Sequence, residues 1–257
     1  MRIAAFQHAP IYDDTARAVD VIVSDLIWAE RHGIELAVFP ESFLQGHSYD
    51  RDVIERRAID LDDPEMQALL ERVSRFKTTA VIGVFERRDV GLFSSAIVVE
   101  SGRILDVYSK AFPVEDGCSP GDRFPVWRRG DRTFGIIICA DLNHPDAAER
   151  LVRQDASLIC CPINMMLRPK KADRWRIPAV DSLRACARRT GCWVMSADVA
   201  GRNHEGWLSY GCTLVVGPDG TVEARAAELV DDRVVFDLPS PCGAKRAEPA
   251  LAGGTRR

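Results

Sequence analysis

The fold class is decided by the stretch Thr133-Phe134-Gly135-Ile136-Ile137-Ile138-Cys139-Ala140-Asp141-Leu142-Asn143-His144-Pro145. Its first part is an apolar run, which is typical of a strand buried on both faces of a sheet. Its second part is polar and ends in a proline, which indicates the start of a helix. A buried strand that leads into a helix predicts an α/β protein, in which ligands bind at the carboxyl ends of the strands.

The order of elements in the first half of the chain is repeated in the second half. Each half alternates short apolar runs with amphipathic segments and then ends in two runs joined by turn residues. This order is typical of parallel strands with crossover helices, followed by an antiparallel hairpin. The predicted strands are 2–7, 36–39, 80–85, 95–100, 103–108, 133–138, 157–161, 193–197, 212–216, 221–226 and 234–238, and the predicted helices start near residues 14, 64, 145 and 178.

This duplication predicts two sheets packed face to face with helices outside, which is a four-layer αββα sandwich. A single sheet with helices on both faces is the alternative. No linker composition separates the halves, so we expect one domain over residues 1–238. Residues 239–257 contain proline, glycine and charge without periodicity, and we expect a C-terminal arm or a disordered tail there.

The composition excludes several classes of protein. The chain has 257 residues, of which 46% are hydrophobic and 28% charged, with a formal net charge of −4. A mildly acidic chain lacks the concentrated basic face that a nucleic-acid partner requires. No apolar run approaches the ~20 residues of a membrane helix, and the N-terminus looks like a strand rather than a signal peptide. We therefore expect a cytoplasmic protein with neither a membrane nor a nucleic acid as its partner.

The chain has eight cysteines, which are too many to ignore and too few for a disulfide scaffold. None forms a CxxC pair, and no cysteine or histidine pair has the spacing of a structural zinc site. Several lie within apolar runs, which is typical of small buried side chains in a reducing compartment. We therefore expect most of them to be reduced structural thiols, and we expect no metal site.

Three reactive side chains follow the ends of predicted strands: Glu41, Lys110 and Cys139. Each alone could be a solvated carboxylate, a surface lysine or a buried thiol. Together they have a chemical logic. Helix N–H groups near a thiol favour the thiolate, a neighbouring carboxylate can move protons, and an ammonium can stabilise an oxyanion. We therefore expect these residues to meet in a nucleophilic site.

These residues lie in motifs that resemble the carbon–nitrogen hydrolase (nitrilase) superfamily in order and spacing. The three motifs are Phe39-Pro40-Glu41, Tyr108-Ser109-Lys110 and Ile138-Cys139-Ala140-Asp141. The resemblance runs across nearly the whole chain. Further matches are Gln7, Gly83-Val84-Phe85-Glu86, Pro120-Gly121, Pro162-Ile163-Asn164, Tyr210-Gly211-Cys212-Thr213 and Pro218-Asp219-Gly220.

The resemblance implies the αββα sandwich and a role for each member of the triad. Cys139 would be the nucleophile, Glu41 the general base and then the general acid, and Lys110 the group that stabilises the transition state. Glu115 is the candidate for the family's supporting glutamate, with a solvated loop carboxylate as the alternative. The family also implies a small-molecule substrate, no cofactor, and a homodimer or higher homo-oligomer.

The chain departs from the family's pattern next to the nucleophile. Ala140 replaces the usual aromatic residue, which opens space beside Cys139 or leaves it to another side chain. Arg168 or Lys170 would suit a substrate that carries a carboxylate. A surface histidine, a solvated basic loop and a packed tryptophan are the alternatives to substrate contact. The predicted substrate-binding residues are His144, Asn164, Met165, Arg168 and Trp207.

Asp141, two residues after the nucleophile, resembles the amidase and carbamoylase branches of the family. The resemblance thus implies hydrolysis of a small linear amide or N-carbamoyl compound through a thioester enzyme intermediate, with release of ammonia. Nitrile hydrolysis by the same triad and a catalytically silent binding protein are alternatives. A Cys–His hydrolase using Cys139 and His144 would leave the Glu41 and Lys110 motifs unexplained. A metal-dependent phosphoesterase, whose fold can also be an αββα sandwich, would need a cluster of Asp, Asn and His at strand ends, and the sequence shows no such set.

Overall fold

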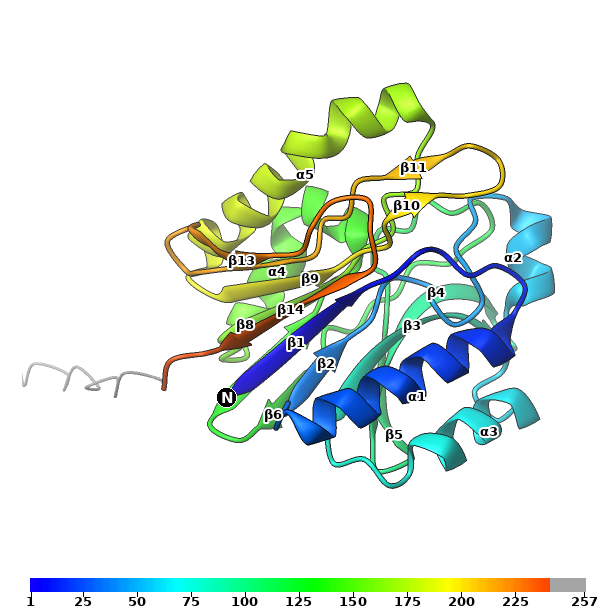
Figure 1. The fold of residues 1–257 in the computed structure, drawn as a ribbon, viewed down its shortest axis with the longest axis horizontal. Coiled ribbons are helices and arrows are strands. Elements are labelled where there is room, and N and C mark those ends of the chain that lie inside the picture. The colour runs from blue at the N-terminus through cyan, green and yellow to red at the C-terminus, as the bar shows by residue number, and fades with distance from the viewer. Residues whose placement is uncertain (241–257) are drawn as a thin grey trace, which may run out of the picture.

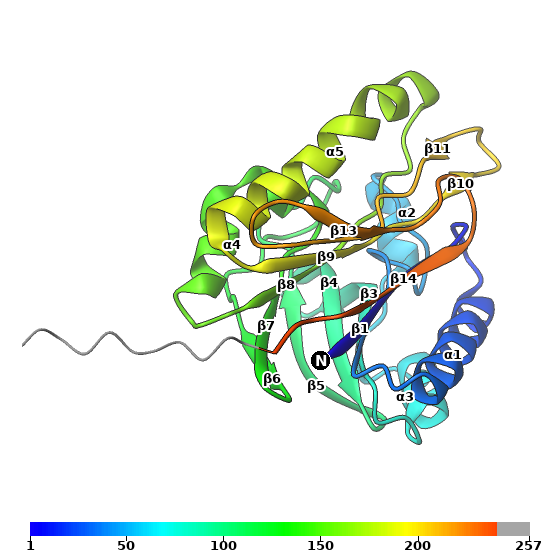
Figure 2. The same cartoon turned by 60° about the vertical axis from the view of Figure 1, so that its left-hand side comes forward.

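Two sheets face each other at the centre of the molecule, and helices cover their outer faces (Figures 1 and 2). The computed structural model describes residues 1–240, so the arm predicted for 239–257 lies almost entirely outside the described residues. The arrangement confirms the predicted αββα sandwich. The alternative of a single sheet is wrong, because the strands of the two halves form separate six-stranded sheets.

The first sheet holds the strands of the first half and the last strand of the chain. Its order is β14-β1-β2-β3-β4-β5, with β1, β2 and β3 parallel and the other strands antiparallel to their neighbours. The strands are β1 (Arg2–Gln7), β2 (Leu36–Val38), β3 (Thr79–Arg88), β4 (Gly91–Glu100), β5 (Arg103–Ser109) and β14 (Asp232–Asp237), and the helices of this half are α1 (Thr15–Arg31), α2 (Arg51–Arg57) and α3 (Pro64–Val73).

The second sheet repeats this arrangement, which confirms the duplication. Its order is β6-β7-β8-β9-β12-β13, again with three parallel strands followed by an antiparallel hairpin. The strands are β6 (Val126–Arg129), β7 (Arg132–Ile136), β8 (Leu158–Pro162), β9 (Trp193–Ala197), β12 (Leu214–Val216) and β13 (Val222–Arg225), with β10 (Gly201–Arg202) and β11 (Leu208–Ser209) apart, and the helices are η1 (Cys139–Asn143, a 3-10 turn), α4 (Pro145–Val152) and α5 (Pro169–Thr190).

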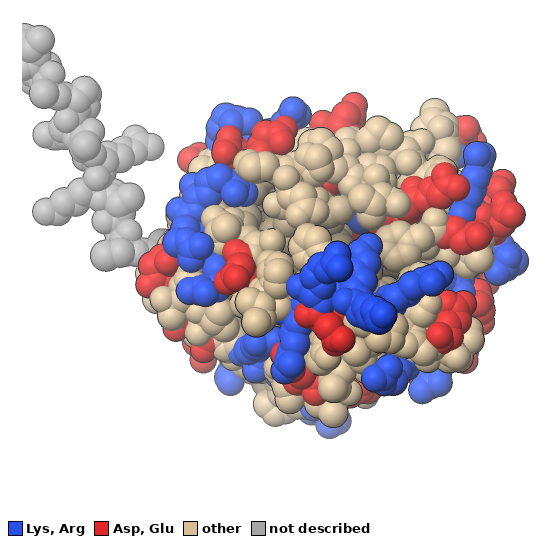
Figure 3. Space-filling view, turned by 90° about the horizontal axis from the view of Figure 1, so that it is seen from above, with Lys and Arg blue, Asp and Glu red and all other residues tan. Residues whose placement is uncertain are grey.

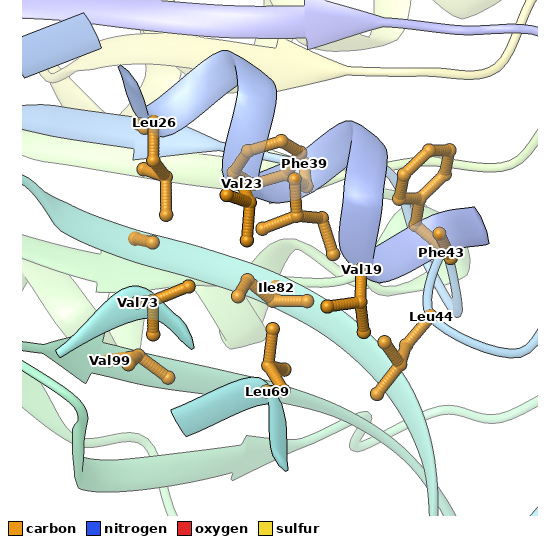
Figure 4. Close-up of a cluster of buried hydrophobic side chains, with 14 of the residues drawn as sticks. Val19, Val23, Leu26, Phe39, Phe43, Leu44, Leu69, Val73, Ile82 and Val99 are labelled. Atoms are coloured by element: carbon orange, nitrogen blue, oxygen red, sulfur yellow. The ribbon is translucent and has the colours of Figure 1, made fainter. Parts of the chain in front are cut away.

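The core is divided into layers because successive side chains of a strand point to opposite faces. In β1, Ile3 and Ala5 belong to the cluster between the two sheets, whereas Ala4 and Phe6 face the helices. Figure 4 shows the helical layer, in which α1 and α3 cover the first sheet. A third cluster joins α4 and α5 to the second sheet, so each sheet packs against helices on its outer face. The residues labelled in Figure 4 are Val19, Val23, Leu26, Phe39, Phe43, Leu44, Leu69, Val73, Ile82 and Val99.

Helix α5 begins earlier than predicted. It starts at Pro169, whose ring suits the first helical turn, and Pro178 lies within it. A proline inside a helix leaves the carbonyl four residues earlier without its donor. Residues 174 and 178 are both exposed, so water can replace that donor. The sequence reading also missed α2, β6 and the β10–β11 pair, all of which are short or largely polar.

The seven cysteines within the described residues are free thiols. Cys160, Cys161, Cys186, Cys192 and Cys212 are buried, as expected for structural thiols, and Cys242 lies outside the described residues. Burial raises the pKa of Cys118 to about 12. Within residues 1–240, no helix is both long and apolar enough to cross a bilayer.

Candidate active site

Glu41 is held in a tight turn after β2. Its backbone N–H donates to the carbonyl of Ile163 at 3.2 Å, which links the two sheets at this point. Strand β3 passes directly against the turn at Gly83, where a Cβ would lie 2.3 Å from the carbonyl oxygen of Pro40 and 2.4 Å from the amide nitrogen of Ser42. Only glycine fits there. The carboxylate of Glu41 is therefore buried in a fixed position, with 1% of the residue exposed.

Lys110 connects two buried carboxylates. Its Nζ donates to Oε1 of Glu41 and to Oε1 of Glu115, each at 2.6 Å. The turn that carries it is closed by Gly121, whose N–H donates to the carbonyl of Lys110 at 2.9 Å. A Cβ on Gly121 would lie 2.2 Å from the carbonyl oxygen of Ser109, so this motif glycine is also required by close packing.

Glu115 is buried, with 4% of it exposed, and is not a solvated loop carboxylate. In addition to Lys110, its Oε1 contacts Nε2 of His47 at 3.0 Å, and its Oε2 accepts from the N–H of Val114 at 2.9 Å. His47 was not predicted from the sequence. The resulting cluster of Glu41, Lys110, Glu115 and His47 is called the charged cluster below.

The charged cluster holds one ammonium against two carboxylates, and this decides which member can take up a proton. Burial raises the pKa of Glu41 above its ordinary value, and the charge of Lys110 offsets this only in part. Burial also acts to raise the pKa of Glu115, but the hydrogen bond from His47 and the charge of Lys110 prevail and lower it. Glu41 is therefore the carboxylate that is poised to bind a proton.

Lys110 stays charged in this environment. Burial acts to lower its pKa, but the charges of Glu41 and Glu115 outweigh burial and raise the pKa well above its ordinary value. Glu41, His47 and Glu115 could otherwise hold a metal ion, since one ligand atom from each lies within 4.8 Å of the others. The ammonium of Lys110 fills the position that a cation would take between the two carboxylates.

Cys139 is the first residue of η1 and has a positive φ of 41°. A side chain other than glycine in this region of φ is strained, by about 1 kcal/mol or more, and such strain is concentrated at functional sites. The turn is held by Asp141, whose carboxylate accepts from the N–H groups of Ile138 and Phe112, both at 2.9 Å, and from the hydroxyl of Tyr108 at 2.7 Å. Asp141 thus links the turn that carries Cys139 to the strand that leads to Lys110.

The thiol of Cys139 is neutral in the resting site. Burial and the charge of Glu41 raise its pKa well above the ordinary value, and the charge of Lys110 and the N–H of Asn164 offset this only in part. This corrects the expectation that helix N–H groups would favour the thiolate. The residues after Cys139 form a 3-10 turn, and α4 begins only at Pro145, so no helix dipole is directed at the sulfur.

A cavity of ≈ 160 Å³ opens beside Cys139. Ala140 lines it, so the space left by the missing aromatic residue is part of the cavity. Met165 also lines it. Asn164 is buried and is not among the lining residues, and its backbone N–H is directed at the sulfur of Cys139. The lining residues are Tyr49, Val114, Cys139, Ala140, Leu142, Asn143, Ile163, Met165, Leu167, Lys171, Trp175, Ala179 and Ser182.

Three predicted substrate-binding residues lie elsewhere. His144 is exposed and stacks on Phe112 at 3.6 Å between ring centroids, and within residues 1–240 it makes no hydrogen bond to Cys139. The Cys–His alternative therefore lacks its geometry. Arg168 is exposed at the start of α5, where its side chain lies outside the cavity. Trp207 lines a second cavity of ≈ 260 Å³, together with His47 and Tyr49.

His47 and Tyr49 were not expected from the sequence. His47 and Tyr49 follow Gly46, whose positive φ of 86° turns the chain back toward Glu41, so the glycine was the available signal. Tyr49 borders both cavities. Burial and the charge of Glu41 raise the pKa of Tyr49.

Comparisons with known proteins identify the family and the fold. A family model described as carbon–nitrogen hydrolase matches residues 2–241. A bifunctional nitrilase/nitrile hydratase of Lupinus angustifolius is 24% identical over 281 residues, which cover 98% of this chain and 75% of that protein.

Two solved structures share the fold. An amidase from Nesterenkonia sp. superposes with a TM-score of 0.82 at 23% identity, covering 93% of this chain and 90% of that chain. A glutamine-dependent NAD+ synthetase from Acinetobacter baumannii superposes with a TM-score of 0.79 at 18% identity, covering 92% of this chain, which spans 45% of that protein. In a variant of the Nesterenkonia amidase, the acetamide moiety of fluoroacetamide is covalently bound to the active-site cysteine.

Proposed function

Because the chain belongs to the carbon–nitrogen hydrolase family, we propose that it cleaves a non-peptide C–N bond of a small linear amide or N-carbamoyl compound. The observation that carries the proposal is the charged cluster beside Cys139, in which one ammonium lies 2.6 Å from two buried carboxylates. The covalent adduct at the active-site cysteine of the Nesterenkonia amidase supports the same chemistry here.

In the first step, the sulfur of Cys139 attacks the carbonyl carbon of the substrate while Glu41 accepts the thiol proton. The raised pKa of Glu41 suits this transfer, because it makes the ionised carboxylate a stronger base toward the neutral thiol. The electron pair of the C=O π bond moves to oxygen, and the ammonium of Lys110 stabilises the resulting oxyanion.

In the next step, Glu41 returns the proton to the substrate nitrogen, the C–N bond breaks and ammonia leaves. A thioester on Cys139 remains. Glu41 then takes a proton from water, the water oxygen attacks the thioester, and the acid and the free thiol are released. If the substrate is an N-carbamoyl compound, the released carbamic acid decomposes to carbon dioxide and the free amine.

Glu115 and His47 serve as positioning residues in this scheme. Nζ of Lys110 lies 2.6 Å from Glu115 as well as from Glu41. Glu115 therefore keeps the ammonium in place when Glu41 binds a proton and loses its negative charge. His47 fixes Glu115 in turn at 3.0 Å. A site whose groups are held by further hydrogen bonds retains its geometry during the reaction.

Nitrile hydrolysis by the same triad is the second candidate. It is favoured by the similarity to the nitrilase/nitrile hydratase of Lupinus angustifolius, which extends over 98% of this chain. Attack of Cys139 on a nitrile carbon would give a thioimidate, which water converts to the same thioester with loss of ammonia.

An ammonia-release screen of linear amides, N-carbamoyl amines and nitriles tests the proposal, with Cys139→Ala as the control. We expect turnover of amides or N-carbamoyl compounds by the wild type, none by the variant, and a thioester adduct on Cys139 by mass spectrometry after rapid acid quenching. Turnover confined to nitriles would replace the amide proposal with the second candidate. If no compound is turned over or attached to Cys139, the hydrolase proposal fails.

A further inference from the structure

Lys171 is the charged side chain of an otherwise uncharged cavity wall. Of the residues that line the Cys139 cavity within the described chain, it alone carries a formal charge at neutral pH. Its ammonium is exposed, and within residues 1–240 it forms no ion pair. The rest of the wall is apolar apart from Tyr49, Asn143 and Ser182 and the thiol itself.

One face of α5 presents Lys171 to the cavity. Lys171, Trp175, Ala179 and Ser182 all line it, at successive intervals of four, four and three residues. Residues at these intervals share a face of a helix. In contrast, Arg168 and Lys170, on the same segment, do not line the cavity. Of these three neighbouring cationic residues, only Lys171 lies on the helix face that lines the cavity.

The charged cluster next to Cys139 makes the two ends of the cavity electrostatically different. Two carboxylates and one ammonium leave that end with a net negative charge, as long as Glu41 is ionised. An anionic substrate group would be repelled there and attracted to the Lys171 end. Ile163, Met165 and Trp175 give the cavity an apolar wall. On the face that includes α5, Lys and Arg side chains stand beside a broad uncharged surface (Figure 3).

We infer that Lys171 determines specificity by binding an anionic group at the far end of the substrate's acyl chain, an inference that rests on the function proposed above. The substrate class is then an amide or N-carbamoyl compound with an apolar spacer and a terminal carboxylate. The carbonyl carbon lies at Cys139, the spacer contacts the apolar wall, and the carboxylate pairs with the ammonium.

The test compares matched pairs of substrates. Half-amides of straight-chain dicarboxylic acids are paired with neutral amides of the same chain length, and with amides that end in an amine. The readout is the ratio of kcat/KM within each pair, measured for the wild type, Lys171→Met, Lys171→Glu and the control Lys170→Met. Lys170 is exposed and lies next to Lys171 but outside the cavity, so the control removes the same charge from the same segment.

We expect the wild type to prefer half-amides, and Lys171→Met to reduce this preference by about tenfold to a hundredfold, chiefly through KM, as expected for the loss of a charge-assisted hydrogen bond. Lys171→Glu should shift the preference to amides that end in an amine. Lys170→Met should keep the wild-type ratio. The wild-type preference should also weaken as salt is added.

Two outcomes would overturn the inference: a wild type that does not prefer half-amides, or a preference that survives in Lys171→Met. A binding measurement separates this failure from that of the proposed function. Calorimetry of half-amides and neutral amides with Cys139→Ala, alone and combined with Lys171→Met, reports recognition without turnover. If nothing is hydrolysed yet half-amides bind in a Lys171-dependent manner, the hydrolase proposal fails and the inference stands as a binding preference. If binding shows no such dependence, the inference fails.

Discussion

Gly83 offers a direct test of whether the turn at Glu41 controls catalysis. In Gly83→Ala, the new Cβ would lie 2.3 Å from the carbonyl oxygen of Pro40, whereas real Cβ contacts essentially never fall below 3.0 Å. The contact must therefore open by about 0.7 Å, which moves the turn that carries Glu41. Catalytic groups must be held within about 0.5 Å of the productive geometry, and a displacement of about 1 Å can cost about 100-fold in rate.

We expect Gly83→Ala to lower kcat about 100-fold and to destabilise the fold by about 1–3 kcal/mol, the usual cost of overpacking. Steady-state ammonia release and thermal unfolding measure the two effects. Gly217→Ala is the matched control, because its Cβ would meet the side-chain oxygens of Glu223 at 3.1 Å and Asp219 at 3.2 Å, which can move away. If Gly83→Ala keeps kcat within a few-fold of the wild type while it remains folded, the turn does not need the close approach and the reasoning is refuted.

Three further changes test the charged cluster and its support. Because the pKa of Glu115 is lowered, its ionised form stabilises the fold above the ordinary pKa of a glutamate, so Glu115→Gln should lower Tm at neutral pH, by about 2–4 °C per kcal/mol lost. An unchanged or raised Tm at neutral pH would contradict this. His47→Gln removes the imidazole hydrogen bond that is the largest cause lowering the pKa of Glu115. The acidic limb of the kcat–pH profile should therefore move to higher pH. An unmoved limb would show that the histidine only fills space. Asp141→Asn replaces a carboxylate that accepts from two backbone N–H groups with an amide. We expect the free energy of unfolding to fall by about 1–3 kcal/mol, measured by chemical unfolding, and kcat to fall at least tenfold. A stable and fully active variant would refute the positioning role of Asp141.

The sequence was sufficient for features that depend on local patterns. Glu41, Lys110 and Cys139 follow strands whose apolar runs are readable, but β2 and β5 belong to the first sheet and β7 to the second, so strand direction alone does not bring the three residues together. The order and spacing of their motifs, which resemble those of the family, indicated that they meet. His47 could not be found in this way, because its contact with Glu115 joins residues 68 apart and no periodic pattern marks it.

Two other errors have identifiable physical causes. Pro169 and Pro178 both fit the first turn of a helix, and the choice of the later proline hid the face that carries Lys171 and Trp175. The pKa of Cys139 was misjudged because a local feature, the following helix, was given more weight than burial and the charge of Glu41, which come from the tertiary structure.

The pairing of β14 with β1 has a consequence for how the molecule is made. In the second half, β6 and β7 are a local hairpin, with Arg129 opposite Arg132. The corresponding edge of the first half is supplied by the last described strand, in which Asp237 lies opposite Arg2. A growing chain can thus complete its second sheet from neighbouring segments, whereas β1 waits for residues more than two hundred positions away. Such distant closure slows folding and leaves an open strand edge until it is met. A permuted chain with β14 moved ahead of β1 would make both edges local hairpins, and should refold faster with the same site.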